Sequence, residues 1–174
     1  MNIILIGYRG CGKTTVGRKL AEQLWMDMVD LDQEVCSHFG TDSVSAIWAE
    51  HGEAAFRELE CIVVVNFLRR DNQVIALGGG TVMQPDGRHA VKKALGAVRI
   101  YLKCTTEELH RRITVDPNTE ALRPHLTNYG GGLKEIKSVL HQRDPIYTTV
   151  ADHTLDVTSL TVDDAVRYLI QRCL

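Results

Sequence analysis

The chain has 174 residues, of which 44% are hydrophobic, 24% charged and 6% aromatic. This composition is typical of a globular protein, and the length favours a single domain over residues 1–174. The formal net charge of -2 argues against a broad nucleic-acid-binding surface, and no apolar run approaches the roughly 18 residues of a membrane span.

The first part of the chain alternates short apolar runs with segments of helical periodicity. The apolar run 2–6 predicts a buried strand, and apolar residues recur at helical spacing over 13–24. Residues 26–32 alternate apolar and acidic side chains, which indicates the end of a second strand. We expect the next helices at 33–39, 43–51 and 53–70, with Gly52 between the last two and Ser43 able to cap the second.

The same alternation continues through the rest of the chain. Apolar runs predict three further strands, at 73–77, 97–102 and 153–157. We expect the remaining helices at 85–95, where Pro85 suits the first turn, and at 105–113, 133–143 and 161–173. The helix at 133–143 is expected to end before Pro145. The segment from about 115 to 132 contains two prolines and three consecutive glycines, which predicts a long mobile loop.

Short strands that alternate with helices predict an α/β fold. Such a pattern indicates a parallel sheet covered by helices on both faces, a three-layer α/β/α arrangement. Ligands of these sheets bind at the carboxyl ends of the strands. The glycine-rich, acidic and arginine-containing segments follow predicted strands, so we expect the functional site there.

The segment GYRGCGKT, residues 7–14, matches the phosphate-loop pattern GxxxxGK[ST]. It follows a predicted strand and begins a predicted helix, which is the structural context that this pattern requires. Its glycines let backbone N–H groups surround phosphate oxygens, and the helix amino terminus adds partial positive charge. Lys13 would reach the β- and γ-phosphates, and the Thr14 hydroxyl would bind Mg²⁺. The pattern therefore predicts nucleoside triphosphate binding without naming the acceptor.

Two acidic residues lie at the end of the second predicted strand. Asp30 and Asp32 are two residues apart, which would place both on one face of an extended segment. Beside a bound triphosphate, such carboxylates can serve Mg²⁺ and an acceptor hydroxyl. The alternative is an acidic strand end in which Asp32 caps the next helix.

A second glycine run and three arginines complete the candidate site. Gly78, Gly79 and Gly80 end a predicted buried strand, where another molecule could approach the backbone closely. Arginine presents a planar fork that pairs with carboxylate or phosphate oxygens. Arg57, Arg123 and Arg143 are the candidates, although any one of them taken alone could be a solvated surface side chain.

Taken together and in this order, these segments resemble the shikimate kinase family over essentially the whole chain. The resemblance is carried by GYRGCGKTT, by DLD at 30–32, by FRELE at 56–60 and by the glycine run. LRP at 122–124 and RDPIY at 143–147 complete it. It implies a P-loop kinase fold with a five-stranded parallel sheet in the order 2-3-1-4-5 and a mobile lid at about 115–132. It also implies ATP- and Mg²⁺-dependent phosphorylation of the 3-hydroxyl of shikimate, in the pathway to chorismate and aromatic amino acids.

The resemblance also implies a role for each matching residue. Asp32 would orient or deprotonate the acceptor hydroxyl, and Asp30 would hold Mg²⁺ together with Thr14. Arg57 and Arg143 would clamp the shikimate carboxylate, beside the glycine run, within an acid-binding region that includes helices at about 33–61. Arg123 would close with the lid onto the phosphates, and Arg112 would lie against adenine, with Arg111 as its rival. The residues expected to bind ATP are Gly10, Cys11, Gly12, Lys13, Thr14, Thr15, Arg112 and Arg123.

Three alternative functions remain open at the level of sequence. The chain could be a kinase of the same architecture that acts on gluconate or a nucleoside monophosphate, or a non-catalytic relative that binds ATP or an acid. A switch GTPase is disfavoured because no NKxD-type guanine-binding segment is found. The five scattered cysteines predict reduced thiols, and with them a cytoplasmic protein. We expect a monomer whose partners are shikimate and ATP, without nucleic acid or membrane.

Overall fold

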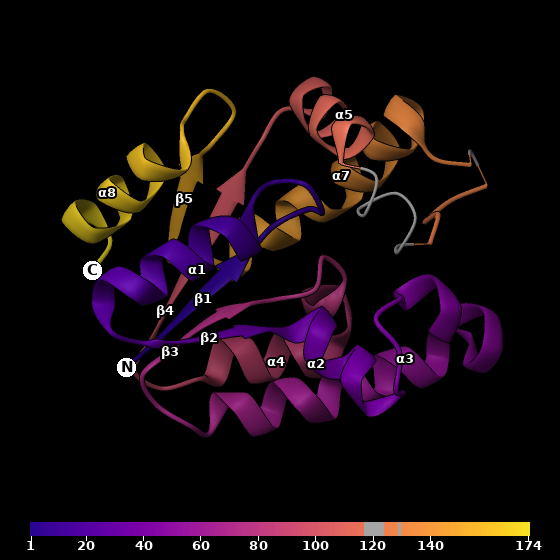
Figure 1. Cartoon of the computed structure of the whole chain (residues 1–174), viewed down its shortest axis with the longest axis horizontal. Coiled ribbons are helices and arrows are strands. Elements are labelled where there is room, and N and C mark those ends of the chain that lie inside the picture. The colour runs from indigo at the N-terminus through magenta and orange to yellow at the C-terminus, as the bar shows by residue number, and fades with distance from the viewer. Residues whose placement is uncertain (117–123, 129) are drawn as a thin grey trace.

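A five-stranded parallel sheet forms the centre of the computed structural model, which describes residues 1–116, 124–128 and 130–174 (Figure 1). The strand order is β2-β3-β1-β4-β5, which confirms the expected topology. Every neighbouring pair is parallel. The strands are β1 (Asn2–Ile6), β2 (Asp27–Asp30), β3 (Gln73–Ala76), β4 (Ala97–Lys103) and β5 (His153–Asp156).

Helices cover both faces of this sheet, as the alternating pattern predicts (Figure 1). The α-helices are α1 (Lys13–Leu24), α2 (Leu31–His38), α3 (Val44–Leu68), α4 (Pro85–Lys93), α5 (Thr106–Val115), α7 (Gly132–Val150) and α8 (Val162–Arg172). A short 3₁₀ helix, η1 (Thr81–Met83), lies between β3 and α4. No helix in the described ranges is long and apolar enough to span a bilayer.

Alternate residues of the central strand β1 belong to two separate cores. Ile3 and Leu5 pack with α1, α5 and α8, whereas Ile4 and Ile6 pack with α2, α3 and α4. All five residues of β1 are buried, as expected for a strand covered on both faces. The helix α7 contributes to both cores because its ends contact different faces of the sheet. The carboxyl end of β1 is therefore held rigidly where the phosphate loop begins.

The prediction that Asp30 and Asp32 share one face of a strand is wrong. Strand β2 ends at Asp30, and α2 begins at Leu31, so Asp32 lies in the first helical turn. The Asp30 side chain is the helix cap, because its Oδ1 accepts a hydrogen bond from the Gln33 backbone N–H at 3.3 Å. A carboxylate that satisfies such an unpaired N–H stabilises the helix start and ends the strand early.

The prediction that a helix ends before Pro145 is also wrong. Helix α7 runs from Gly132 to Val150, with Pro145 inside it. A proline within a helix costs about 3 kcal/mol because its N–H is missing and its ring crowds the previous turn. Tyr147 and Val150 lie after it and are fully packed into the core. Burial of two such side chains contributes about 1.5–3 kcal/mol each, which is enough to offset that cost.

Two other predictions bear on the site. Gly52 has φ 83° and ψ 160°, so it interrupts α3 as expected, and Ser43 caps the first half by accepting from Ala46 N at 3.2 Å. Residues 117–123 and 129 of the predicted lid at about 115–132 lie outside the described residues, and Arg123 is among them. Val115, the first residue of that segment, is instead the last residue of α5.

Candidate functional site

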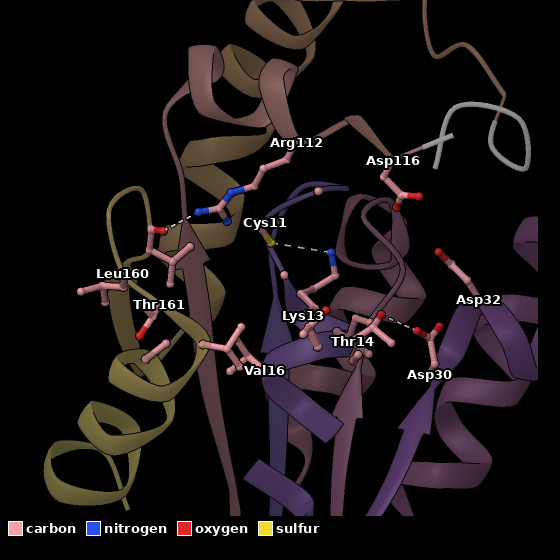
Figure 2. A pocket seen from close by; sticks show the side chains of 18 residues that line it. Cys11, Lys13, Thr14, Val16, Asp30, Asp32, Arg112, Asp116, Leu160 and Thr161 are labelled. Atoms are coloured by element: carbon pink, nitrogen blue, oxygen red, sulfur yellow. Dashed lines mark hydrogen bonds between the residues drawn. The ribbon is translucent and has the colours of Figure 1, made fainter. Parts of the chain in front are cut away.

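The phosphate loop joins the carboxyl end of β1 to the amino terminus of α1 (Figure 2). Gly10 and Gly12 have φ angles of 81° and 97°, a backbone region that side chains rarely allow. A Cβ at Gly10 would also approach Ile113 Cγ1 to 2.9 Å. Helix α1 begins directly after Gly12, so its unpaired backbone N–H groups open onto this loop.

Lys13 lies folded into the loop itself. Its ammonium donates to the carbonyl oxygens of Gly7 and Tyr8, at 2.8 and 3.1 Å, and the residue is 7% exposed. The same ammonium lies 3.9 Å from Cys11 Sγ (Figure 2). These neutral oxygens hold the cation next to the loop opening. Phosphate oxygens are stronger acceptors for an ammonium and can replace them.

Asp30 and Thr14 meet across the opening of the loop. The Thr14 hydroxyl donates to Asp30 Oδ2 at 2.6 Å, which places two hard oxygen atoms side by side (Figure 2). Mg²⁺ prefers such oxygen ligands and usually retains several waters and substrate phosphates. The pair therefore fits the magnesium site expected from the sequence.

These residues line a cavity of about 410 Å³ at the carboxyl end of the sheet. Asp116, Leu160 and Thr161 lie on other sides of it (Figure 2). The predicted nucleotide-binding residues that line this cavity are Gly10, Cys11, Gly12, Lys13, Thr14, Thr15 and Arg112. The loop, the cation and the helix terminus together form a site for a polyphosphate.

The structure distinguishes Arg112 from its neighbour Arg111. Arg112 lines the cavity, donates to Glu108 Oε1 at 2.7 Å and donates to the Val157 carbonyl at 2.9 Å. Arg111 is paired with the same glutamate, but its side chain is 63% exposed. Residues 111 and 112 point in different directions because consecutive helix positions are about 100° apart.

A second, smaller cavity of about 50 Å³ lies beside the glycine run. Arg57, Arg143, Gly79 and Gly80 line it, as the sequence predicts, together with Trp48 from α3. Arg9 lines the same pocket, and three guanidinium groups in one pocket indicate an anionic ligand.

Arg57 is held by carboxylates and aromatic rings. Its Nη1 donates to Glu60 Oε2 at 2.8 Å, and its guanidinium carbon lies 5.6 Å from the Trp48 ring centroid. Burial disfavours the Arg57 cation, but Glu60 and then Glu53 outweigh that effect and raise its pKa. Burial also raises the pKa of Glu60, against the opposing effect of Arg57. The guanidinium is thus a fixed cation in the pocket.

Arg143 and Tyr147, both from α7, hold the glycine run. Arg143 Nη1 and the Tyr147 hydroxyl donate to the Gly79 carbonyl, at 2.9 and 2.5 Å. A Cβ at Gly80 would lie 2.5 Å from Arg57 Nη2. One at Gly78 would lie 2.5 Å from carboxylate oxygens of Asp32 and Glu60. A side chain at either position would force these charged groups to shift, so glycine at 78 and 80 lets them approach the backbone closely.

Asp32 is the residue that the linings of the two cavities share, among the residues described. Its carboxylate points toward the opening of the phosphate loop from the start of α2 (Figure 2). Helix α2 therefore presents one carboxylate at the junction of a polyphosphate site and an anion pocket. That position suits a group that handles a proton during transfer between two bound molecules.

Sequence reasoning missed several residues that organise the site. Glu60 is fully buried, orients Arg57 and accepts from the Thr81 hydroxyl at 2.7 Å. Its spacing of three residues after Arg57 was the available signal, since such neighbours meet on a helix surface. Tyr147 ends the RDPIY segment, four residues after Arg143, which was the available signal for it. Glu135 gave no such signal, because its partner Arg9 is distant in the sequence.

Comparisons with known proteins agree with this geometry. The family model described as shikimate kinase matches residues 9–174. The shikimate kinase of Caldanaerobacter subterraneus subsp. tengcongensis is 36% identical, covering 98% of this chain and 94% of the relative. The shikimate kinase of Pelotomaculum thermopropionicum is 37% identical, covering 97% of this chain and 93% of the relative. The solved structure of Acinetobacter baumannii shikimate kinase in complex with shikimate has a TM-score of 0.87 at 30% identity, covering 98% and 90%. This chain belongs to the shikimate kinase family.

Proposed function

We propose that this protein transfers the γ-phosphoryl group of ATP to the 3-hydroxyl of shikimate, giving shikimate 3-phosphate and ADP. The observation that carries the proposal is the position of Asp32 between the polyphosphate cavity and the pocket that Arg57 and Arg143 line. A kinase needs those two sites side by side because catalysis of phosphoryl transfer depends mostly on positioning and charge. The product would feed the synthesis of chorismate and aromatic amino acids.

The acceptor is held by its carboxylate in this proposal. Arg57 and Arg143 supply guanidinium forks that match the two oxygens of a carboxylate. Gly79 lies next to Arg143 and Gly80 next to Arg57, and both line the pocket, whereas the predicted substrate-binding residue Gly78 lies against Asp32 and Glu60. Glu60 keeps Arg57 in place, so the clamp is present before the ligand arrives.

ATP is held by the phosphate loop. Lys13 exchanges its carbonyl partners for the β- and γ-phosphates, while backbone N–H groups from Gly10 to Thr15 face the other oxygens. Arg112 lies at the far side of the cavity, where the adenine would extend. Thr14 and Asp30 would hold Mg²⁺, which when bound neutralises charge on the β- and γ-phosphates.

The chemistry is an in-line displacement. The 3-hydroxyl oxygen forms a bond to the γ-phosphorus while the bond from that phosphorus to the β–γ bridging oxygen breaks, and ADP leaves. Asp32 orients the hydroxyl and accepts its proton as the new bond forms. Lys13 stabilises the negative charge that develops on the transferred group. Arg123, which lies outside the described residues, would add a second cation as part of the lid at about 115–132.

The remaining expectations belong to the same proposal. We expect one domain over residues 1–174 in which α2 and the first half of α3 bind the acid, within the predicted region 33–61. We also expect a cytoplasmic monomer with no nucleic-acid or membrane partner. All five cysteines carry thiols rather than disulfides, which supports a reducing compartment.

The test is ADP release from Mg·ATP with shikimate, gluconate, CMP or no acceptor. We expect release only with shikimate, and phosphorus NMR should identify a 3-phosphate. Release with gluconate or CMP instead would preserve the phosphate site and contradict the carboxylate clamp. Absence of release with every acceptor, together with tight ATP binding, would favour the non-catalytic alternative.

A further inference from the structure

Three buried donor atoms without a partner belong to residues that line the smaller cavity, which Arg57 and Arg143 also line and which we call the acid pocket. Among the described residues, the buried side-chain polar atoms that lack a hydrogen-bond partner are the Tyr8 hydroxyl, Arg9 Nε, Trp48 Nε1 and Gln73 Oε1. The first three can donate a hydrogen bond, and their residues all line this one pocket. A buried donor without an acceptor destabilises the protein, so three in one place indicate acceptors that arrive with a ligand.

Arg9 is fixed so that only one of its nitrogen atoms lacks a protein acceptor. Its Nη2 donates to Glu135 Oε1 at 2.7 Å, and its Nη1 donates to the Pro124 carbonyl at 2.8 Å. Glu135 is fully buried, and its Oε2 accepts from the backbone N–H groups of Leu126 and Thr127, each at 3.0 Å. Both ends of the ion pair are thereby immobilised, and Nε remains as the unused donor on the pocket wall.

Tyr8 and Trp48 supply neutral donors beside it. Tyr8 is 1% exposed, and burial raises its pKa despite the opposing charge of Arg9, so the hydroxyl keeps its proton at neutral pH. The Trp48 ring contacts the Arg57 guanidinium with one face, which fixes the plane of its indole N–H. Tyr8 and Arg9 are neighbours in the phosphate loop, whereas Trp48 comes from α3.

The charges around the pocket determine which ligand atoms suit these donors. Arg57 and Arg143 already match a carboxylate, and the acceptor hydroxyl belongs with Asp32. Hydroxyl oxygens elsewhere on the shikimate ring are the acceptors that remain. The neutral O–H of Tyr8 and N–H of Trp48 suit a neutral hydroxyl. A site that donates to a hydroxyl rejects an analogue without it, because the buried donor is then left unpaired.

We propose that Tyr8, Arg9 and Trp48 form a hydroxyl-binding wall that recognises the 4- and 5-hydroxyls of shikimate. This inference rests on the proposed function. Tyr8, Arg9 and Trp48 are substrate-binding residues in it, and Glu135 is a positioning residue that acts through Arg9. The pocket selects a polyhydroxylated ring acid by these donors in addition to its carboxylate clamp.

The test combines removal of each donor with removal of each hydroxyl. Tyr8→Phe and Trp48→Phe remove one donor atom while keeping the ring, and Arg9→Lys removes Nε while keeping a cation for Glu135. Dissociation constants for shikimate, 4-deoxyshikimate and 5-deoxyshikimate are measured by titration calorimetry. Tyr168→Phe, on the exposed surface of α8, is the matched control. Urea unfolding identifies any variant whose stability has fallen.

Tyr8→Phe and Trp48→Phe are each expected to bind shikimate about three- to tenfold more weakly than the wild type, the effect of one neutral hydrogen bond. Arg9→Lys is expected to bind it about 10- to 100-fold more weakly, because a charged donor makes a stronger hydrogen bond. With one of the two deoxy analogues, the one that lacks the hydroxyl bound by the donor removed, each variant and the wild type should have equal dissociation constants. The Tyr168→Phe control should bind shikimate and both deoxy analogues like the wild type. Equal losses with all three ligands, or no loss with shikimate, would overturn the hydroxyl-binding wall and leave the kinase proposal intact. If the wild type neither binds nor phosphorylates shikimate, the proposed function fails and this inference fails with it.

Discussion

Glu60 and Arg57 lie one helical turn apart on α3, and their side chains meet through a 2.8 Å hydrogen bond from Nη1 to Oε2. Glu60 is fully buried, whereas the Arg57 guanidinium reaches the acid pocket. A buried carboxylate that also accepts from Thr81 cannot move without breaking both contacts. The cation that would bind the acceptor is therefore positioned before any ligand is present.

Replacement of Arg57 with Ala should mainly weaken binding of the acid. Loss of a charge-assisted contact costs about 1.5–3 kcal/mol, so the KM for shikimate should rise about 10- to 100-fold. The KM for ATP should stay close to that of the wild type, because Arg57 lies outside the polyphosphate cavity. Steady-state kinetics with each substrate varied will measure both. An unchanged KM for shikimate would remove Arg57 from the clamp, and Arg167→Ala on the exposed side of α8 is the control.

Replacement of Glu60 with Gln should also raise the KM for shikimate, by a smaller factor than Arg57→Ala. Glu60 acts through Arg57 and does not itself contact the substrate in this proposal. The amide keeps an oxygen for Thr81 but removes the charge that holds Arg57. We expect the KM for shikimate to rise about 3- to 30-fold, with a smaller change in kcat. Glu58→Gln, on the same helix and outside the acid pocket, provides the comparison. If both variants behave alike, Glu60 has no positioning role.

Asp32→Asn should lower kcat by about 100- to 10,000-fold, the range for loss of a general base. Equilibrium binding of ATP should change little, because the phosphates are held by the loop and by Lys13. ADP release under saturating substrates and calorimetric ATP titration will separate the two effects. Asp27→Asn, at the exposed start of β2, is the matched control. A kcat near that of the wild type would contradict the proton-accepting role of Asp32.

Thr14→Val should raise the Mg²⁺ concentration needed for half-maximal activity. The substitution keeps the shape of the side chain but removes the hydroxyl that pairs with Asp30. Loss of a group at a metal site should cost at least about tenfold in metal affinity. A titration of ADP release against Mg²⁺ at fixed ATP measures this. Thr148→Val, exposed on α7, should leave the midpoint unchanged, and an unchanged midpoint for Thr14→Val would contradict the proposed metal site.

Gly78→Ala should destabilise the protein as well as the site. The new Cβ would lie 2.5 Å from oxygens of Asp32 and Glu60, so the buried carboxylate must shift. Such overpacking costs about 1–3 kcal/mol of unfolding free energy. Gly79→Ala is the natural comparison because its nearest contact, Arg143 Nη1, is at an ordinary 3.5 Å. Urea unfolding should give Gly78→Ala a clearly lower unfolding free energy than Gly79→Ala. Equal values for the two variants would contradict the close approach of Asp32 and Glu60 to Gly78.

Local spacing in the sequence determined the phosphate loop, the strands and most of the helices. A glycine-rich turn between an apolar run and a helical pattern needs only neighbouring residues, and the loop around Lys13 was predicted in that way. The strand order followed from resemblance to a family. The interruption of α3 at Gly52 was also predictable, because a positive φ is a property of one residue.

Only the tertiary structure decided which side chains meet across the chain. Asp32 became a helical residue because Asp30 capped α2, and α7 continued through Pro145 because Tyr147 and Val150 are buried beyond it. The pair Arg9–Glu135 spans 126 positions, and nothing in the spacing of those two residues predicts it. Sequence patterns specify contacts within about one helical turn, whereas such long-range pairs depend on how the helices pack against the sheet.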